Sequence, residues 1–250
     1  MADSRILAAL DAAAAAGPFY VLDTDPPPTI GVDVPAWRPF RELVADPTVL
    51  AARVAAVTDA VAERAGLERH RIDRRAAVSL THLGLAARLV CPSMGTALLG
   101  GVLLDLDPAR LWWRDVLGPV PLALPDPTGR PAPTAPGDLA RELSDDLAAG
   151  PVAALTAAAA DLGVSRKVLW GNVASALAGT LPALTAAAGT RAGAARAVVT
   201  GLLQTGILAD TGSFRGPGGR FVRNSCCLYY RVPGGGYCGD CLLAAPPPGA

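Results

Sequence analysis

The sequence lacks an excess of charge of either sign, and it has few aromatic residues. Lys and Arg number 22, Asp and Glu also number 22, and aromatic residues make up 5% of the chain. A protein that binds nucleic acid by neutralising phosphates normally carries a basic excess, so we expect no nucleic-acid partner. Lys167 is the single lysine. This arginine bias is typical of a GC-rich coding sequence and indicates nothing about function.

A secretory signal is also missing from residues 1–20, because Asp3 and Asp11 fall there and no basic segment precedes an apolar run. The uncharged segment 168–190 is long enough to cross a bilayer at ~1.5 Å per residue. It is rich in Ala, Gly and Thr and contains Asn172 and Pro182. We therefore expect a buried helix or helix pair there, and a cytoplasmic protein.

Nucleotide-binding signatures are absent as well. No Gly-x-Gly-x-x-Gly motif follows an expected strand, and there is no Walker A motif. The Gly-rich stretch at 212–220 precedes no expected helix, which argues against a phosphate cradle. If NAD(P)H or flavin supplies electrons, we expect it to act through a separate reductase.

Apolar residues are plentiful, at 51% of 250 residues with a mean hydropathy of +0.35. A chain of this composition can bury a full core, so global disorder is excluded. The pattern predicts an α+β protein that is mostly helical, with a small antiparallel sheet and a C-terminal segment set apart by its cysteines. We expect one compact unit with an N-terminal region (1–123), a Pro-rich connector (124–137) and a helical region (138–250).

Caps, breakers and apolar spacing predict the individual elements. Residues 18–45 are expected to be irregular, and two or three hairpin-linked strands are expected within 100–123. Pro92 is expected to end the second long helix, Ser165 to cap a later one and Thr190 to cap the last one. The expected helices cover residues 3–17, 46–66, 73–91, 138–149, 151–162, 165–179 and 191–204.

Cysteine placement is the most informative feature. The chain has five cysteines, and four of them lie within sixteen residues: Cys226, Cys227, Cys238 and Cys241. Clustered thiols in a cytoplasmic protein indicate metal binding rather than disulfides. Four thiolates satisfy either a tetrahedral zinc ion or the two irons of a [2Fe–2S] cluster.

The adjacent pair of cysteines favours the cluster over zinc. Neighbouring side chains on an extended chain point to opposite sides, so two adjacent sulfurs converge poorly on one ion. A cluster offers two irons to such a pair. The segment LYYRV at 228–232 has strand propensity and PGGG at 233–236 is a turn, so the chain is expected to fold back and bring the second pair to the first. A structural zinc site and a disulfide pair stay open as alternatives.

The string NSCCLYYRVPGGGYCGDC at 224–241 resembles the signature of the FhuF family, the bacterial siderophore ferric reductases, in which Cys-Cys is followed by ten residues, Cys, two residues and Cys. The segment LGVSRKVLWGNVASAL at 162–177 also resembles a block of this family. AAVSLTHLGLAARLVCPSM at 76–94 resembles its N-terminal helix more weakly. About sixty residues carry most of the resemblance.

The resemblance implies a [2Fe–2S] cluster whose ligands are Cys226, Cys227, Cys238 and Cys241. It also implies one-electron reduction of Fe(III) held in a siderophore, typically of hydroxamate type, and release of iron in the cytoplasm. At most peripheral membrane association is expected. The electron donor would be a separate protein such as a ferredoxin or a flavin reductase.

Five polar or aromatic residues flank the cysteines and are candidates for substrate binding: Arg223, Tyr229, Tyr230, Arg231 and Tyr237. The aromatics could contact the siderophore, and the arginines could offset the negative charge of the cluster or bind the donor. Packing of one tyrosine into the core and solvation of Arg231 are the alternative. Asn172 is expected to tie its helix to the cysteines, and His82 to be packed or hydrogen-bonded rather than a metal ligand.

Two other functions are compatible with the same residues. A non-enzymatic iron–sulfur protein for electron transfer or sensing would hold the same cluster without accelerating iron release. A zinc-stabilised, siderophore-related binding module would be colourless.

Overall fold

The structure is a computed structural model that describes residues 3–25, 35–188, 192–215 and 219–244. Eight α-helices and short antiparallel strand pairs lie in these ranges, so the predicted α+β, mostly helical class is confirmed. The helices are α1 (Ser4–Ala14), α2 (Phe40–Ala45), α3 (Pro47–Ala65), α4 (Arg74–Leu99), α5 (Pro136–Ala149), α6 (Pro151–Asp161), α7 (Arg166–Ala188) and α8 (Ala192–Leu202). The strands are β1 (Trp37–Pro39), β2 (Val102–Leu104), β3 (Trp112–Arg114), β4 (Leu122–Ala123), β5 (Gly129–Pro131), β6 (Gly212–Phe214) and β7 (Phe221–Arg223).

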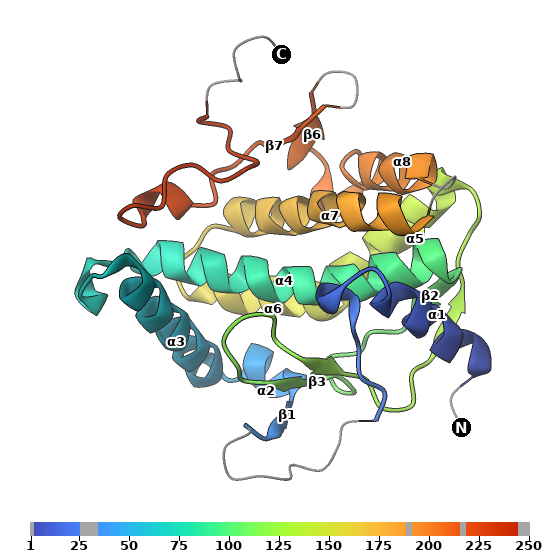
Figure 1. The fold of residues 1–250 in the computed structure, drawn as a ribbon, viewed down its shortest axis with the longest axis horizontal. Helices are drawn as coiled ribbons and strands as arrows, with labels where there is room; N and C mark the ends of the chain where they lie inside the picture. The colour runs from blue at the N-terminus through green and yellow to red at the C-terminus, as the bar shows by residue number, and fades with distance from the viewer. Residues whose placement is uncertain (1–2, 26–34, 189–191, 216–218, 245–250) are drawn as a thin grey trace.

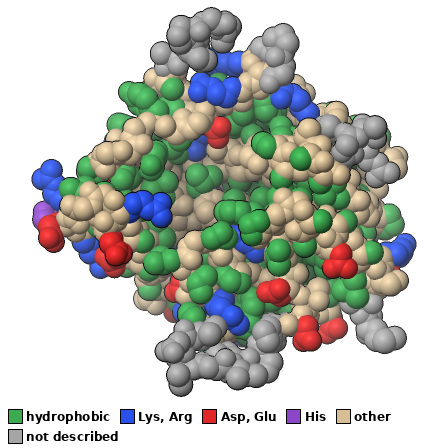
Figure 2. Space-filling model, in the orientation of Figure 1, with side chains coloured by type: hydrophobic (Ala, Val, Ile, Leu, Met, Phe, Trp, Pro, Cys, Tyr) green, Lys and Arg blue, Asp and Glu red, His purple; other side chains and the backbone are tan. Residues whose placement is uncertain are grey.

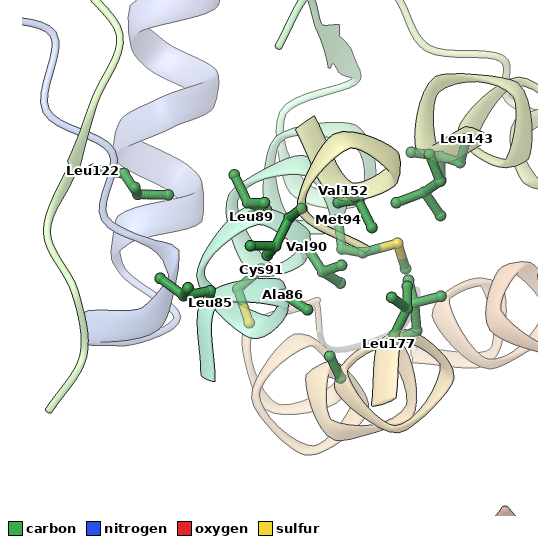
Figure 3. Close-up of a cluster of buried hydrophobic side chains, with 14 of the residues drawn as sticks. Leu85, Ala86, Leu89, Val90, Cys91, Met94, Leu122, Leu143, Val152 and Leu177 are labelled. Atoms are coloured by element: carbon green, nitrogen blue, oxygen red, sulfur yellow. The ribbon is translucent and has the colours of Figure 1, made fainter. Parts of the chain in front are cut away.

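Helix α4 is the central element of the fold (Figure 1). It packs along α7 and also contacts α1, α3 and α6. Leu89, Val90 and Met94 of α4 are buried, and Figure 3 shows them in one cluster with Val152 of α6 and Leu177 of α7. Full burial of each such side chain contributes roughly 1.5–3 kcal/mol. The long axis of α4 therefore fixes where the other helices lie.

The expected end of this helix at Pro92 is wrong, because α4 continues to Leu99. Proline removes one backbone hydrogen bond and costs about 3 kcal/mol inside a helix. Beyond it, however, Met94 and Ala97 are buried in the core, and the Thr96 hydroxyl donates to the Pro92 carbonyl at 3.0 Å. Burial of the last two turns offsets the cost of the proline.

Several predicted helix ends are confirmed. The Asp3 and Asp46 carboxylates accept from backbone N–H groups at the starts of α1 and α3, and α3 ends at Gly66 with a left-handed φ of 64°. The Ser165 hydroxyl oxygen accepts from the N–H of Val168 at 3.4 Å. Thr190, the expected cap of α8, lies outside the described residues.

The strand pairings depart from the sequence prediction. Residues 100–123 do hold three strands, but only β3 and β4 pair with each other. Strand β1, in a stretch predicted to be irregular, pairs with β3, and β2 pairs with β5. Because β5 lies within the predicted connector 124–137, that connector is partly a strand. The division of the chain into two regions stays a prediction.

Helix α7 is a single helix and passes through Pro182. By length and composition α7 could cross a membrane, and no other helix among the described residues is both long and apolar enough to do so. In the window that qualifies, 61% of the residues are buried inside the protein, against α4, α6 and α8. This burial is the property of a core helix, as the sequence predicts.

The surface carries dispersed charge. On the face shown in Figure 2, cationic and anionic side chains are scattered among hydrophobic ones. This distribution accords with the formal net charge of zero.

The crossing of α1 over α4 provides a test of this packing. A Cβ added at Gly95 would lie 2.7 Å from Ala13 Cβ and 2.9 Å from Tyr20 Cδ1. We expect Gly95→Ala to lower the free energy of unfolding by about 1–3 kcal/mol through overpacking.

Gly179 in α7 is the control position, because a Cβ added there meets no atom within 4 Å. Gly179→Ala should therefore raise stability, by up to about 1 kcal/mol. Urea denaturation measures both, and equal effects would contradict the close approach.

Candidate metal centre

One face of α7 supports the cysteine segment, defined here as residues 223–241. Val168, Asn172 and Ser175 are spaced four and three apart, so they lie on one face of the helix. The guanidinium Nη2 of Arg223 donates to the Val168 carbonyl at 3.2 Å and to Asn172 Oδ1 at 2.5 Å. The Ser175 hydroxyl donates to the carboxylate of Asp240. The helix thus holds both ends of the segment.

Gly171 lies on the same face and permits close approach. A Cβ at this position would fall 2.1 Å from Ser225 Oγ and 3.1 Å from Arg223 Nη2. Only a residue without a side chain lets the segment reach α7 here. At the other end, the Arg223 N–H donates to the Asp240 carbonyl at 3.1 Å, so the chain that carries the second cysteine pair returns to the start of the first.

The return of the chain brings thiols together. Cys227 Sγ lies 3.3 Å from Cys238 Sγ, and both Cys227 and Cys241 are buried. All five cysteines are free thiols. Among the described residues, no group of three or more Cys, His, Asp or Glu side chains has an arrangement that could hold a metal ion. The close approach of the two pairs follows the fold-back predicted from the sequence.

The fold-back uses different backbone geometry from that predicted. Tyr229–Arg231 form a short 3-10 helix, η5, instead of a strand. Leu228, directly after the Cys-Cys pair, has a left-handed φ of 67°. This conformation is costly for a non-glycine residue, and it redirects the chain at the point where the adjacent sulfurs would otherwise diverge.

Two of the thiols accept from the backbone N–H two positions later. Leu228 N donates to Cys226 Sγ and Leu243 N to Cys241 Sγ, both at 3.3 Å. The backbone N–H groups of Tyr229 and Asp240 likewise favour the thiolate forms of Cys227 and Cys238. Such N–H···S bonds favour the thiolate form, which is the form that binds metal. The donor chemistry of the four cysteines therefore fits a cofactor held by thiolates, although the described side chains do not gather three of the sulfurs around one point.

The two close thiols have opposite proton affinities. The hydrogen bond with Cys238 lowers the pKa of Cys227 to about 6, and the same bond raises the pKa of Cys238. Burial raises the pKa of Cys226. One proton shared between two sulfurs is the arrangement expected of two closely coupled thiols.

Arg223 is a buried cation beside these thiols. Its side chain is 1% exposed, its Nε has no hydrogen-bond partner, and no carboxylate within the described residues forms a salt bridge with it. Burial lowers the pKa of Arg223, whereas the nearby sulfurs of Cys227, Cys238 and Cys226 and the Asp240 carboxylate raise it. A buried charge is stable only with a counter-charge. Thiolates that bind a metal cluster provide one.

A chain of buried polar groups extends from Arg223 into the core. Asn172 is fully buried and donates through Nδ2 to Ser79 O at 2.9 Å and to His82 Nδ1 at 3.5 Å. His82 Nε2 lies 3.1 Å from Thr156 Oγ1, whose own proton goes to the Val152 carbonyl. His82 therefore carries its proton on Nε2. Its burial lowers its pKa to about 3.

The structure separates the predicted flanking residues. Arg223 is buried under the thiols, and Tyr229 packs beside Ala76, Leu228 and Val232. Tyr230 and Tyr237 are exposed. Arg231 is also exposed and forms a salt bridge with Asp73 at 3.0 Å. Only Arg223 and Tyr229 therefore pack close to the thiols, while Arg231 is paired on the surface.

Sequence reasoning missed three residues of this site. Ser175 and Ser225 contact the segment or its support, and Ser79 anchors Asn172. Ser175 could have been found from the sequence, because it follows Gly171 by four positions and Asn172 by three and so shares their face of the helix. No local pattern marks Ser79, because it meets Asn172 from 93 positions away.

Residues 223–241 match the family model described as the FhuF 2Fe-2S C-terminal domain. This match confirms the resemblance indicated by the cysteine spacing, and it confirms a [2Fe–2S] cluster as the cofactor. No curated protein matches the chain.

The neutral His82 makes stability depend on pH. Its pKa is about 3 when folded, below its ordinary value of 6.5, so its contribution is fully present above pH 6.5 and is lost as the pH falls towards 3. Between pH 7 and pH 5 this residue should cost about 2 kcal/mol of unfolding free energy. His82→Gln keeps a donor towards Thr156 and should remove that part of the slope. Urea unfolding at the two pH values measures it, and an unchanged slope in the variant would contradict the assignment.

Arg223 should set the reduction potential of the cluster. Reduction adds negative charge, which a nearby buried cation stabilises. Arg223→Gln should lower the potential by about 60 mV, equivalent to a tenfold change in the equilibrium constant for one electron. Arg223→Lys should restore part of the shift. Arg220→Gln is the control, because Arg220 is exposed and its one side-chain hydrogen bond within the described residues goes to the Gly239 carbonyl. Redox titration followed by electron paramagnetic resonance measures the potentials, and equal values for all variants would contradict the role.

Proposed function

We propose that this protein is a ferric-siderophore reductase of the cytoplasm. The observation that carries the proposal is the conjunction of four thiols in a matched 2Fe-2S domain with the buried cation of Arg223, which forms no salt bridge within the described residues. Such a site is suited to holding a negatively charged cluster that changes its charge by one. The substrate class is the one that the resemblance to the FhuF family implies.

In this proposal, Cys226, Cys227, Cys238 and Cys241 hold the [2Fe–2S] cluster. Backbone N–H groups stabilise the sulfurs, and Arg223 offsets their charge. The Asn172 amide holds the guanidinium through Oδ1, and Ser79 holds the amide. The protein therefore supplies position and electrostatics, and the cofactor, when bound, supplies one electron at a time.

A single electron is sufficient to release the iron. Anionic oxygen donors bind Fe(III) far more tightly than Fe(II), because the higher charge gains more from them. In the overall change, chelated Fe(III) becomes Fe(II) and a separate one-electron donor protein is oxidised by one electron. No group is transferred, so no general acid or base is needed. A ferredoxin or a flavin reductase is the class of donor we propose, and the substrate is a ferric siderophore of hydroxamate type.

Trapping of Fe(II) tests the proposal. Purified holoprotein, a reduced ferredoxin and a ferric trihydroxamate are mixed with a chromogenic chelator specific for Fe(II). We expect one Fe(II) for each electron supplied, at a rate well above that with the donor alone. Cys238→Ser should return the rate to that background. Cys91→Ala is the matched control, because Cys91 is the one cysteine outside the segment and is buried in the core.

A holoprotein that accepts electrons but leaves the rate of iron release at background would contradict the reductase function. It would then be an electron-transfer or sensing protein.

A further inference from the structure

A large pocket adjoins the cysteine segment. It has a volume of about 810 Å³ and lies between α3, α4, the loop at 117–120 and residues 229–235. This volume is in the range of sites that take small molecules of several hundred daltons. The residues of the segment that line it are Tyr229, Val232, Pro233, Gly234 and Gly235.

The pocket and the thiols share one loop. Tyr229 lines the pocket, follows Cys227 by two positions and packs in one apolar cluster with Cys226. Val232 is buried at the base of the same loop. A molecule in the pocket is therefore separated from a sulfur of the cysteine segment by little more than one residue. The pocket beside β2 and α6 and the pocket beside α1 and β5 are lined by no residue of the cysteine segment.

The walls have apolar surface and an unused hydrogen-bond donor. Leu117 lines the pocket although it is 61% exposed, and Val57 and Leu80 contribute further apolar area. Arg53 is 4% exposed, and its Nε has no hydrogen-bond partner. An orphaned buried donor costs free energy unless a ligand or water satisfies it. A ligand oxygen in the pocket would do so.

The charges around the pocket balance. Arg53 and Arg64 line it together with Glu63, and Arg53 forms a salt bridge with Asp115 at 2.8 Å. The two cations are thus matched by two anions. Three singly charged hydroxamates neutralise Fe(III), whereas three doubly charged catecholates leave a trianion that would need an excess of cations.

From this geometry we propose that the pocket is the docking site of the ferric chelate, and that it accepts chelates without net charge. The proposal rests on the reductase function for its ligand. The apolar arms of the chelate contact Leu117, Val57 and Leu80. A carbonyl or hydroxamate oxygen accepts from Arg53 Nε, and the iron faces the loop that begins at Tyr229. Arg53 is a binding residue in this account, and Tyr229 is a positioning residue.

The test separates binding from reduction. Gallium(III) resembles Fe(III) in size and charge and is not reduced, so its trihydroxamate of zero net charge reports binding alone. Gly84 lines the pocket, is exposed, and has no atom within 4 Å of an added Cβ. Gly84→Trp therefore fills the pocket without displacing the core. Gly179→Trp is the matched control, on an exposed and equally open position of α7 that does not line the pocket.

With holoprotein and isothermal titration calorimetry, we expect Gly84→Trp to weaken binding of the gallium trihydroxamate at least tenfold. The KM for the ferric trihydroxamate should rise to match, and the reduction potential should not change. Arg53→Lys keeps the charge but lacks Nε, so affinity should fall about tenfold. Gly179→Trp should behave as the wild type, and a gallium tris-catecholate should bind at least tenfold more weakly than the trihydroxamate.

Two results would overturn the pocket assignment. One is wild-type affinity and KM in Gly84→Trp, and the other is no binding of the gallium trihydroxamate by the wild-type holoprotein. Tighter binding of the tris-catecholate would overturn the charge selectivity. A wild-type protein that binds the gallium chelate in this pocket but does not reduce the ferric one would leave the pocket standing and refute the reductase function.

Discussion

The hydrogen bond between Arg223 and Asn172 is the interaction on which the rest of the site depends. It joins β7 to α7 at 2.5 Å, in an interior where neither side chain meets water. The amide cannot turn away, because Ser79 and His82 occupy its other end. The guanidinium is therefore fixed under the thiols before any cofactor binds, so little reorganisation is needed when the cluster changes its charge.

The packing of α4 along α7 explains why these long helices tolerate residues that disfavour a helix. Prolines lie within α4 and α7, and Gly171 lies within α7. Each is costly for an isolated helix. In the folded protein, α4 and α7 pack along each other and carry the polar chain between them. Burial of their shared surface stabilises both helices, and the small residue at 171 gives the cysteine segment access to the backbone of α7.

The sequence alone predicts the parts of this structure that depend on local chemistry. Asp46 and Gly66 mark the ends of α3, and the four cysteines and their spacing predict the cofactor and the match of residues 223–241 to the FhuF 2Fe-2S C-terminal domain. The pairings β1–β3 and β2–β5 could not be predicted from the sequence, since they join distant short strands without a hairpin turn. The helix end predicted at Pro92 is wrong because helix propensity takes no account of the burial of Met94 and Ala97 beyond it. The sequence predicts that Asn172 ties its helix to the cysteine segment, and the bond from Arg223 to Asn172 confirms this. The partner lies 51 positions away and the pocket needs walls from four segments, so only the folded chain reveals the partner and the pocket.

The central claim is that Cys226, Cys227, Cys238 and Cys241 hold a [2Fe–2S] cluster beside Arg223. The most direct measurement is the ultraviolet–visible spectrum of anaerobically purified protein, before and after dithionite, with iron, sulfide and zinc analysis. The account predicts charge-transfer bands that bleach on reduction, with two irons and two sulfides per chain. A colourless protein that holds one zinc per chain, even after anaerobic reconstitution with iron and sulfide, would contradict it.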